Sequence, residues 1–219
     1  MKSLRQSLHK QDLLGLGIMV ILFVVFYFLF DEEILDDYWE TNVILILINI
    51  IMAVSLNLIN GLTGQFSIGH AGFMAVGAYT SAIITVKLGM DFPIALIVAT
   101  VSAAFLGFLI GMPTLRLNGD YLAIATLGLG EIIRIAILNI DYVGGASGFM
   151  GIPRLTTFPI AFWIMVFVVY FIKNFKNSAD GRACLAIREN EIAAETMGIN
   201  TTKYKVMAFT IGAGFAGTA

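Results

Sequence analysis

Residues 13–30 read LLGLGIMVILFVVFYFLF, an uncharged apolar run of 18 residues. As an α-helix this run measures about 27 Å, close to the hydrocarbon thickness of a bilayer. Basic residues precede the run, and the acidic residues Asp31, Glu32 and Glu33 follow it. The apolar core of a secretory signal is shorter, about 7–15 residues, and leads into a small-residue cleavage site. The run therefore predicts a first membrane span that stays in the protein.

The rest of the chain repeats this pattern. Hydrophobic residues make up 58% of it and charged residues 13%, against about 25% charged residues in a soluble domain. A last apolar stretch from Val206 to Ala219 is too short to cross a bilayer, so we expect the sequence to be incomplete at its C-terminus. The composition predicts an all-α fold, a polytopic integral membrane helical bundle forming one transmembrane domain over residues 1–219. The further predicted spans are residues 43–60, 67–88, 93–112, 121–139 and 158–172.

The basic residues are distributed unevenly over this predicted topology. If the N-terminus is cytoplasmic, only Lys87 and Arg154 fall in the outer loops. Such an excess of cytoplasmic Lys and Arg is what sets the orientation of membrane proteins. We therefore predict a multi-pass protein of the cell (inner) membrane with a cytoplasmic N-terminus. The basic residues on the cytoplasmic side are Lys2, Arg5, Lys10, Arg116, Lys173, Lys176, Arg182, Arg188, Lys203 and Lys205.

A polar, glycine-rich run interrupts the apolar pattern at residues 57–79. Broken backbone at membrane depth is tolerated only against protein or a water-filled cavity, so the run is either a structural hinge or a pathway lining. A histidine with no partner at metal-ligand spacing does not predict a metal site. The polar members, all candidates for the translocation pathway or its gate, are Asn57, Asn60, Gln65, Ser67 and His70.

Two further features lie within the predicted spans. Glu131 and Arg134 are three residues apart and therefore share one helix face, where they can form an ion pair. Because a lone charge near the bilayer centre is costly, we expect the pair to face the bundle interior, as a gate or as a neutralised structural pin. Small residues four apart, such as Gly107 and Gly111, predict close helix packing.

Residues 177–205 lie between two predicted spans on the cytoplasmic side. Ser178 or Asp180 is placed to cap a helix starting near Arg182, and Gly198 with the asparagine that follows is a stop signal. The pattern predicts a short amphipathic helix pair. A capped, alanine-rich pair favours docking of a partner over a solvated loop.

Several function classes are not supported by the sequence. It holds no P-loop motif for ATP and no motif of a hydrolase or metalloprotease, so no catalytic residue is predicted. Its one cysteine, Cys184, excludes an internal disulfide and a cysteine-based metal cluster. No basic stripe with interleaved aromatics indicates nucleic-acid binding, and neither a cofactor nor a metal is expected.

Taken together, several ordered motifs resemble the membrane permeases of branched-chain amino-acid ABC importers, the LivM type. The similarity extends from residue 50 to residue 219. Members of this family run on past this endpoint, in agreement with an incomplete last span. The motifs that carry the resemblance are residues 57–79, 113–127, 130–134, 144–153 and 181–200.

The resemblance implies a subunit of an importer for branched-chain or related hydrophobic amino acids. Its implied partners are ABC ATPase subunits that hydrolyse the ATP, a second homologous permease, an extracytoplasmic binding protein and membrane lipid. A secondary transporter or a structural membrane subunit is the alternative. Within residues 177–200 the resemblance implies a cytoplasmic coupling helix that docks on the ATPase. Its candidate coupling residues are Arg182, Arg188, Glu189, Ala193, Ala194, Met197 and Gly198.

Overall fold

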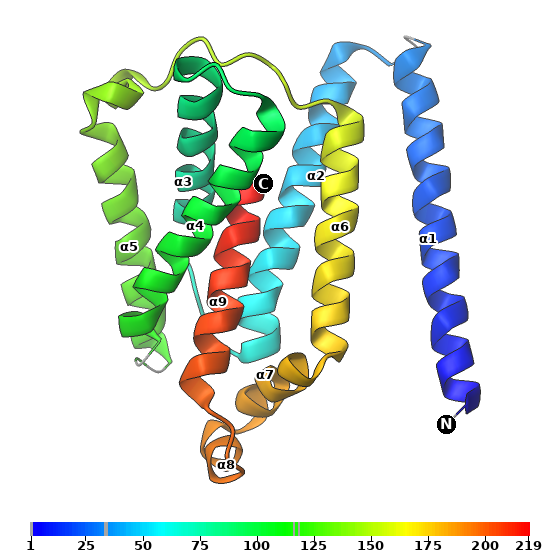
Figure 1. Cartoon of the computed structure of the whole chain (residues 1–219), viewed down its shortest axis with the longest axis vertical. Coiled ribbons are helices and arrows are strands. Elements are labelled where there is room, and N and C mark those ends of the chain that lie inside the picture. The colour runs from blue at the N-terminus through cyan, green and yellow to red at the C-terminus, as the bar shows by residue number, and fades with distance from the viewer. Residues whose placement is uncertain (1, 33–34, 116, 118) are drawn as a thin grey trace. The chain divides into compact units, whose positions relative to one another are not determined.

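The computed structural model describes residues 2–32, 35–115, 117 and 119–219. These residues form helices and irregular segments, and no strand occurs among them, so the all-α prediction is confirmed (Figure 1). In chain order the helices are α1 (Lys2–Asp31), α2 (Asp37–Asn57), η1 (Leu58–Leu62), α3 (His70–Ala82), η2 (Ile83–Lys87), α4 (Phe92–Thr114), α5 (Asp120–Leu138), η3 (Asp141–Val143), η4 (Gly145–Ser147), α6 (Phe158–Asn177), α7 (Ala179–Glu189), α8 (Glu191–Thr196) and α9 (Thr201–Thr218).

Among the described residues, four helical stretches are long and apolar enough to cross a membrane. The apolar part of α1, Gly17–Asp31, is shorter. The predicted span at 67–88 is helical only from His70 onward, so its polar start is not part of a helix. The span count and the orientation stay predictions, and Glu33 and Arg116 lie outside the described residues. The four stretches are Asp37–Leu62, Phe92–Thr114, Asp120–Leu138 and Phe158–Asn177.

The chain divides into two compact units, and helices α2 and α6 contribute residues to both. The first unit holds residues 1–47 and 156–164. Its contacts are mostly aromatic: the Phe23 ring lies 5.9 Å from that of Phe158 and 5.2 Å from that of Phe162. The Glu40 carboxylate also accepts a hydrogen bond of 3.4 Å from the backbone N–H of Phe158. This unit carries none of the candidate site residues.

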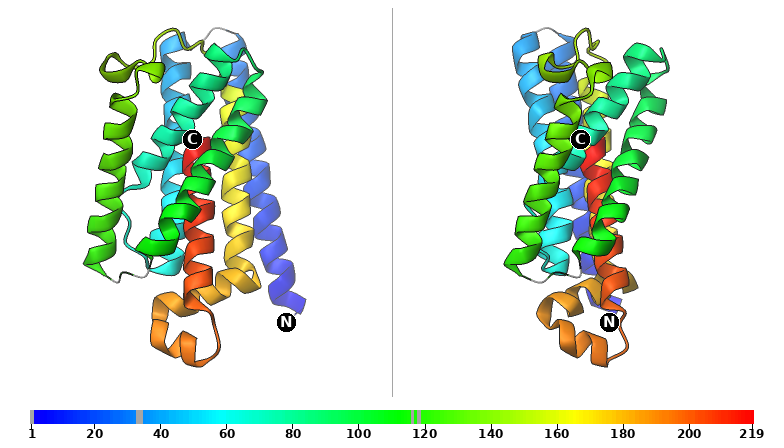
Figure 2. Two further views of the ribbon diagram at one scale, coloured as in Figure 1. Left: turned by 60° about the vertical axis from the view of Figure 1, so that its left-hand side comes forward. Right: turned by 90° about the vertical axis from the view of Figure 1, so that its left-hand side faces the viewer.

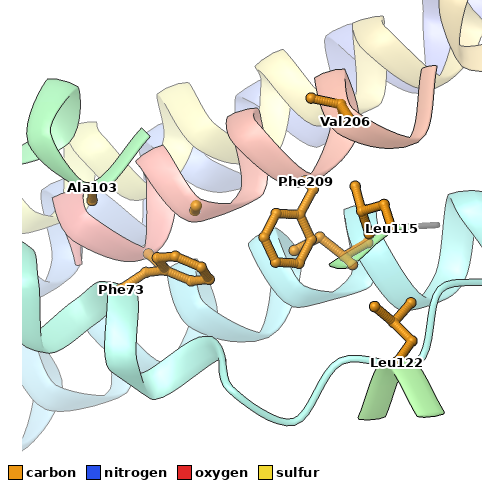
Figure 3. Close-up of a cluster of buried hydrophobic side chains, with 9 residues drawn as sticks. Phe73, Ala103, Leu115, Leu122, Val206 and Phe209 are labelled. Carbon is orange, nitrogen blue, oxygen red and sulfur yellow. The ribbon is translucent and has the colours of Figure 1, made fainter. Parts of the chain in front are cut away.

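The second unit, residues 48–155 and 165–219, is organised around α9. Helix α9 packs against α3, α4, α7 and η1. Its Phe209 is fully buried and meets the Phe73 ring edge-on, with the centroids 5.5 Å apart (Figure 3). The short apolar stretch at the end of the sequence is thus the centre of this unit's core. The core cluster is Ile59, Phe73, Ala103, Leu115, Leu122, Val206, Phe209, Ala213 and Ala216.

Small residues let the backbones around α9 approach one another closely. A Cβ atom on Gly77 of α3 would lie 2.2 Å from the carbonyl oxygen of Gly217. On α4, a Cβ atom on Gly107 would lie 2.4 Å from the Cβ atom of Ala213. The close packing predicted for Gly107 and Gly111 is therefore confirmed, since a Cβ atom on Gly111 would also lie only 3.2 Å from the Phe209 ring of α9.

Within the second unit, successive connections lie at opposite ends of the helices. The segment after η1, the α4–α5 connection and the α7–α8 pair lie at one end, and residues 139–155 lie at the other (Figures 1 and 2). This alternation matches the predicted up-and-down path of the chain. It places the α7–α8 pair beside the end of the glycine-rich break.

Candidate functional site

The glycine-rich run contains a break in the helical path between α2 and α3. Helix α2 widens into the π-turn η1, and residues 64–69 are not helical. Gly64 turns the chain with a φ of +69°, a value that favours glycine. The Ile68 N–H donates a 3.1 Å hydrogen bond to the Thr126 hydroxyl of α5. At Gly69 a Cβ atom would lie 2.0 Å from the Thr126 carbonyl oxygen, so the break is seated directly on the α5 backbone.

A buried hydrogen bond joins the two sides of this break. The Ser55 hydroxyl of α2 lies 2.8 Å from Nε2 of His70, the first residue of α3. Because this hydroxyl donates its proton to the Met52 carbonyl at 2.9 Å, it accepts from Nε2–H of His70. The Nδ1 atom of His70 is then an acceptor without a hydrogen-bond partner in the described protein. The imidazole therefore acts as a link between α2 and α3.

The predicted pathway residues of the break are buried inside the second unit. Gln65, Ser67 and His70 are each exposed by 4% or less, and the side chains of Gln65 and Ser67 make no hydrogen bond in the described structure. Asn60 accepts a 3.2 Å hydrogen bond from the Ser67 N–H, whereas Asn57 is exposed at the end of α2. In this conformation the side chains of Ser67 and His70 are packed inside the unit, whereas Gln65 also borders a hollow of about 300 Å³ with Arg188 and Glu191.

Glu131 and Arg134 form the predicted ion pair, with 2.9 Å between Oε2 and Nε. Their side chains are 53% and 63% exposed, so the expectation that the pair faces the bundle interior is wrong for this chain. The reason is that α5 packs on α3 through its small residues, which leaves the charged face outward. The pair lines an open hollow of about 240 Å³ with Ala71 and Ala75 of α3. The structure therefore does not bring the pair together with Gln65, Ser67 and His70.

Each helix of residues 177–205 begins at a side-chain cap. Ser178 accepts a hydrogen bond from the Gly181 N–H at 3.1 Å, and Asn190 accepts one from the Ala193 N–H at 3.0 Å. Gly198 then ends α8 with a φ of +84°. The predicted helix pair is confirmed, although α7 starts at Ala179, three residues earlier than expected.

The candidate coupling residues do not share one face of the pair. Ala194 is only 4% exposed because α8 packs on α7 and α9, so it is not part of the exposed surface of the pair in this conformation. Ile192 and Met197 are instead 76% and 82% exposed. Arg182, Glu189, Ala193 and Gly198 are also exposed. Arg188 is exposed by 44% and at the same time contacts the break.

Two buried polar groups anchor the pair to the membrane domain. Lys205 of α9 is buried and forms an ion pair of 2.5 Å with Glu191 of α8. Cys184 of α7 is fully buried, and its burial, with the nearby charge of Asp180, raises the pKa of the thiol to about 11. Sequence reasoning did not identify Lys205 as buried, since a lysine near the end of a span usually reaches water.

The break and the helix pair are the features that comparison with known proteins can interpret. The chain matches the model of the family described as "Branched-chain amino acid transport system / permease component" over residues 38–219. The chain belongs to this family. The description of the family is that of a permease component of a transport system.

Curated relatives of this permease include the LivM protein of the high-affinity branched-chain amino acid transport system of Escherichia coli (strain K12). It is 38% identical, over 80% of this chain and 49% of the relative. The LivM protein of Salmonella typhimurium (strain LT2) is 36% identical, over 97% of this chain and 57% of the relative. The chain thus spans about half the length of the curated relatives it matches. No solved structure matches it.

Sequence reasoning missed the residues that hold the break in place. Ser55 and Thr126 sit as single hydroxyl residues in apolar runs, where they resemble ordinary packing residues. Their role depends on contacts with residues 15 and 58 positions away. The only available sequence signal was that a buried hydroxyl needs a hydrogen-bond partner.

Proposed function

We propose that this protein is a permease subunit of an ATP-driven importer for branched-chain or related hydrophobic amino acids. Its α7–α8 pair would dock on a separate ATPase subunit, a second permease would cover α5, and an extracytoplasmic binding protein would deliver the substrate. The protein would lie in the cell (inner) membrane with its N-terminus in the cytoplasm. Family membership and the relatives' printed role in branched-chain amino acid transport support this proposal.

The observation that carries the proposal is the apolar surface of α8. Ile192 and Met197 are both more than three-quarters exposed on a capped helix at the end of the second unit. On the cytoplasmic side these side chains would face water rather than lipid. Large apolar side chains gathered at the tip of a short helix are typical of a protein-binding surface. In the proposed importer, the partner that would cover this surface is a soluble ATPase subunit.

The test introduces a charge at this surface. We expect Ile192→Glu and Met197→Glu to leave membrane levels normal, to weaken co-purification of a P-loop ATPase, and to reduce uptake of labelled leucine. Thr202→Glu, which adds the same charge at an exposed position on the first turn of α9, is the matched control. If both α8 variants retain the ATPase and full uptake, the segment is a solvated loop and the proposal loses its mechanical support.

The exposed ion pair on α5 supports the presence of a second membrane subunit. A charged pair facing lipid in mid-span would be costly, so a protein surface or a water-filled path is its expected surroundings. We expect Glu131→Ala and Arg134→Ala each to lower uptake, because each leaves one charge uncompensated. The double variant should be milder than the worse single variant. Additive losses in this cycle would exclude functional pairing.

A further inference from the structure

Arg188 connects the end of α7 to the break in the membrane domain. Its Nη1 atom donates a 2.9 Å hydrogen bond to the carbonyl oxygen of Gly61, 127 residues earlier in the chain. Gly61 lies in the last turn of η1, where carbonyl groups lose their helical partners because the chain leaves the helix. The guanidinium therefore serves as the missing donor for a carbonyl at the start of the break.

The same arginine is fitted against the turn that follows. A Cβ atom on Gly64 would lie 2.9 Å from Cγ and 3.4 Å from Cα of Arg188, so the side chain covers the glycine closely. Glu189 fixes the other edge of the guanidinium, with its Oε1 atom 2.6 Å from Nη2 and 3.2 Å from Nε. The group is thus held from two sides, and its position follows that of α7.

Helix α7 is attached firmly enough to transmit a displacement. Its Gly181 lies against the Phe175 carbonyl at the end of α6, where a Cβ atom would be 2.1 Å from that oxygen. Cys184 and Ile187 bury the inner face of the helix. The break is less firmly held, because the Gln65 and Ser67 side chains are buried there without hydrogen-bond partners in the described structure. A movement of α7 would therefore act on the less satisfied segment.

We propose that Arg188 is the positioning residue through which movement of the α7–α8 pair reaches the break between α2 and α3. This inference rests on the proposed docking of an ATPase on α8. It assigns the role of Arg188 to its contacts with the break, although the side chain is 44% exposed. A docking residue would contact the ATPase, whereas Arg188 contacts Gly61 and covers Gly64 of its own chain. Coupling would then pass from α7 to the Ser55–His70 link.

The test separates docking from transmission in the complex purified from the native host. In Arg188→Ala we expect the ATPase to co-purify normally and basal ATP hydrolysis to persist. Stimulation of hydrolysis by the substrate-loaded binding protein should disappear, and uptake should fall about tenfold or more, the factor expected for losing one hydrogen bond to a charged group. Arg188→Lys, which retains one donor, should restore part of both. Lys176→Ala is the control, since it removes an exposed basic side chain at the end of α6 that belongs to no candidate site.

Each alternative outcome overturns a different statement. Loss of ATPase association in Arg188→Ala alone would make Arg188 a docking residue and refute the coupling role. Uptake equal to that of Lys176→Ala would show that the contact with Gly61 transmits nothing. If Arg188→Ala is not made at normal levels, Gly64→Ala takes its place. This variant retains Arg188, but its added Cβ atom pushes the arginine side chain away from the break. It must show the same loss of stimulated ATP hydrolysis and of uptake. If the wild-type protein purifies without any ATPase, the proposed function itself fails.

Discussion

The contact between α3 and α9 gives the sharpest test of the fold. Adding one methyl group in Gly77→Ala would place a Cβ atom 2.2 Å from the Gly217 carbonyl oxygen and 2.5 Å from its Cα. Real Cβ atoms essentially never approach other atoms within 3.0 Å, and here the opposing atoms belong to backbone. The two helices must therefore separate, which disturbs the core around Phe73 and Phe209.

The magnitude follows from two opposing terms. Overpacking a well-packed core costs about 1–3 kcal/mol, and a rigid backbone neighbour places this variant at the upper end. Replacing glycine by alanine in a helix returns up to about 1 kcal/mol. We expect a net loss of about 2 kcal/mol, which for a chain of this size lowers the melting temperature by about 4–8 °C. Gly128→Ala on α5, where a Cβ atom meets nothing within 4 Å, is the control and should melt at or above the wild-type temperature.

The assay uses the single cysteine of the chain. Cys184 is fully buried, so a maleimide dye that fluoresces on reacting with a thiol reports unfolding of the detergent-purified protein. Wild type, Gly77→Ala and Gly128→Ala are heated in parallel with this dye. If Gly77→Ala melts together with Gly128→Ala, the close approach of α3 and α9 is refuted, and with it the central position of α9.

Two further predictions concern the α7–α8 pair. Because burial raises the pKa of Cys184 to about 11, the fold favours the neutral thiol. This stabilisation is fully present below the unfolded pKa and is lost as the pH rises toward about 11. The melting temperature of the wild type should therefore fall more steeply over this pH window than that of Cys184→Ala, and equal falls would contradict the raised pKa. Glu191→Ala should lower the melting temperature more than Glu195→Ala, because it leaves the buried ammonium of Lys205 unpaired; with Glu191 itself partly exposed, the expected cost is about 1–2 kcal/mol. Equal melting temperatures for the two variants would show that the ion pair does not hold α8 in place.

The features that depend on local pattern were predictable from the sequence. The apolar runs predicted helices, Ser178 predicted the start of α7, and Gly198 predicted the end of α8. Each of these features depends on only a few neighbouring residues. The spacing of Glu131 and Arg134 gave their ion pair for the same reason. Resemblance then supplied the family, which the match over residues 38–219 confirms.

The features that depend on which face of a helix is covered were not predictable. Ala194 looked like a docking residue because small side chains permit close approach, yet the same property lets α8 pack on its own chain. Met197, a predicted coupling residue, is exposed, and so is Ile192, which was not among the predicted site residues. Helical periodicity defines faces but does not say which neighbour occupies each one.

Two exposed surfaces of this chain differ in polarity from the surroundings expected for them: one is charged where lipid is expected, and the other is apolar where water is expected. On α5 the ion pair of Glu131 and Arg134 faces outward from a helix long and apolar enough to span a membrane, where lipid would leave the charges unsolvated. On α8 the side chains of Ile192 and Met197 face outward at the end of the unit, where water would surround apolar surface. A single protein partner cannot resolve both mismatches if one surface lies at membrane depth and the other beyond it. The two surfaces therefore support the proposal of two different partners, one within the membrane and one soluble, which is the arrangement expected of a permease subunit rather than of a transporter that acts alone.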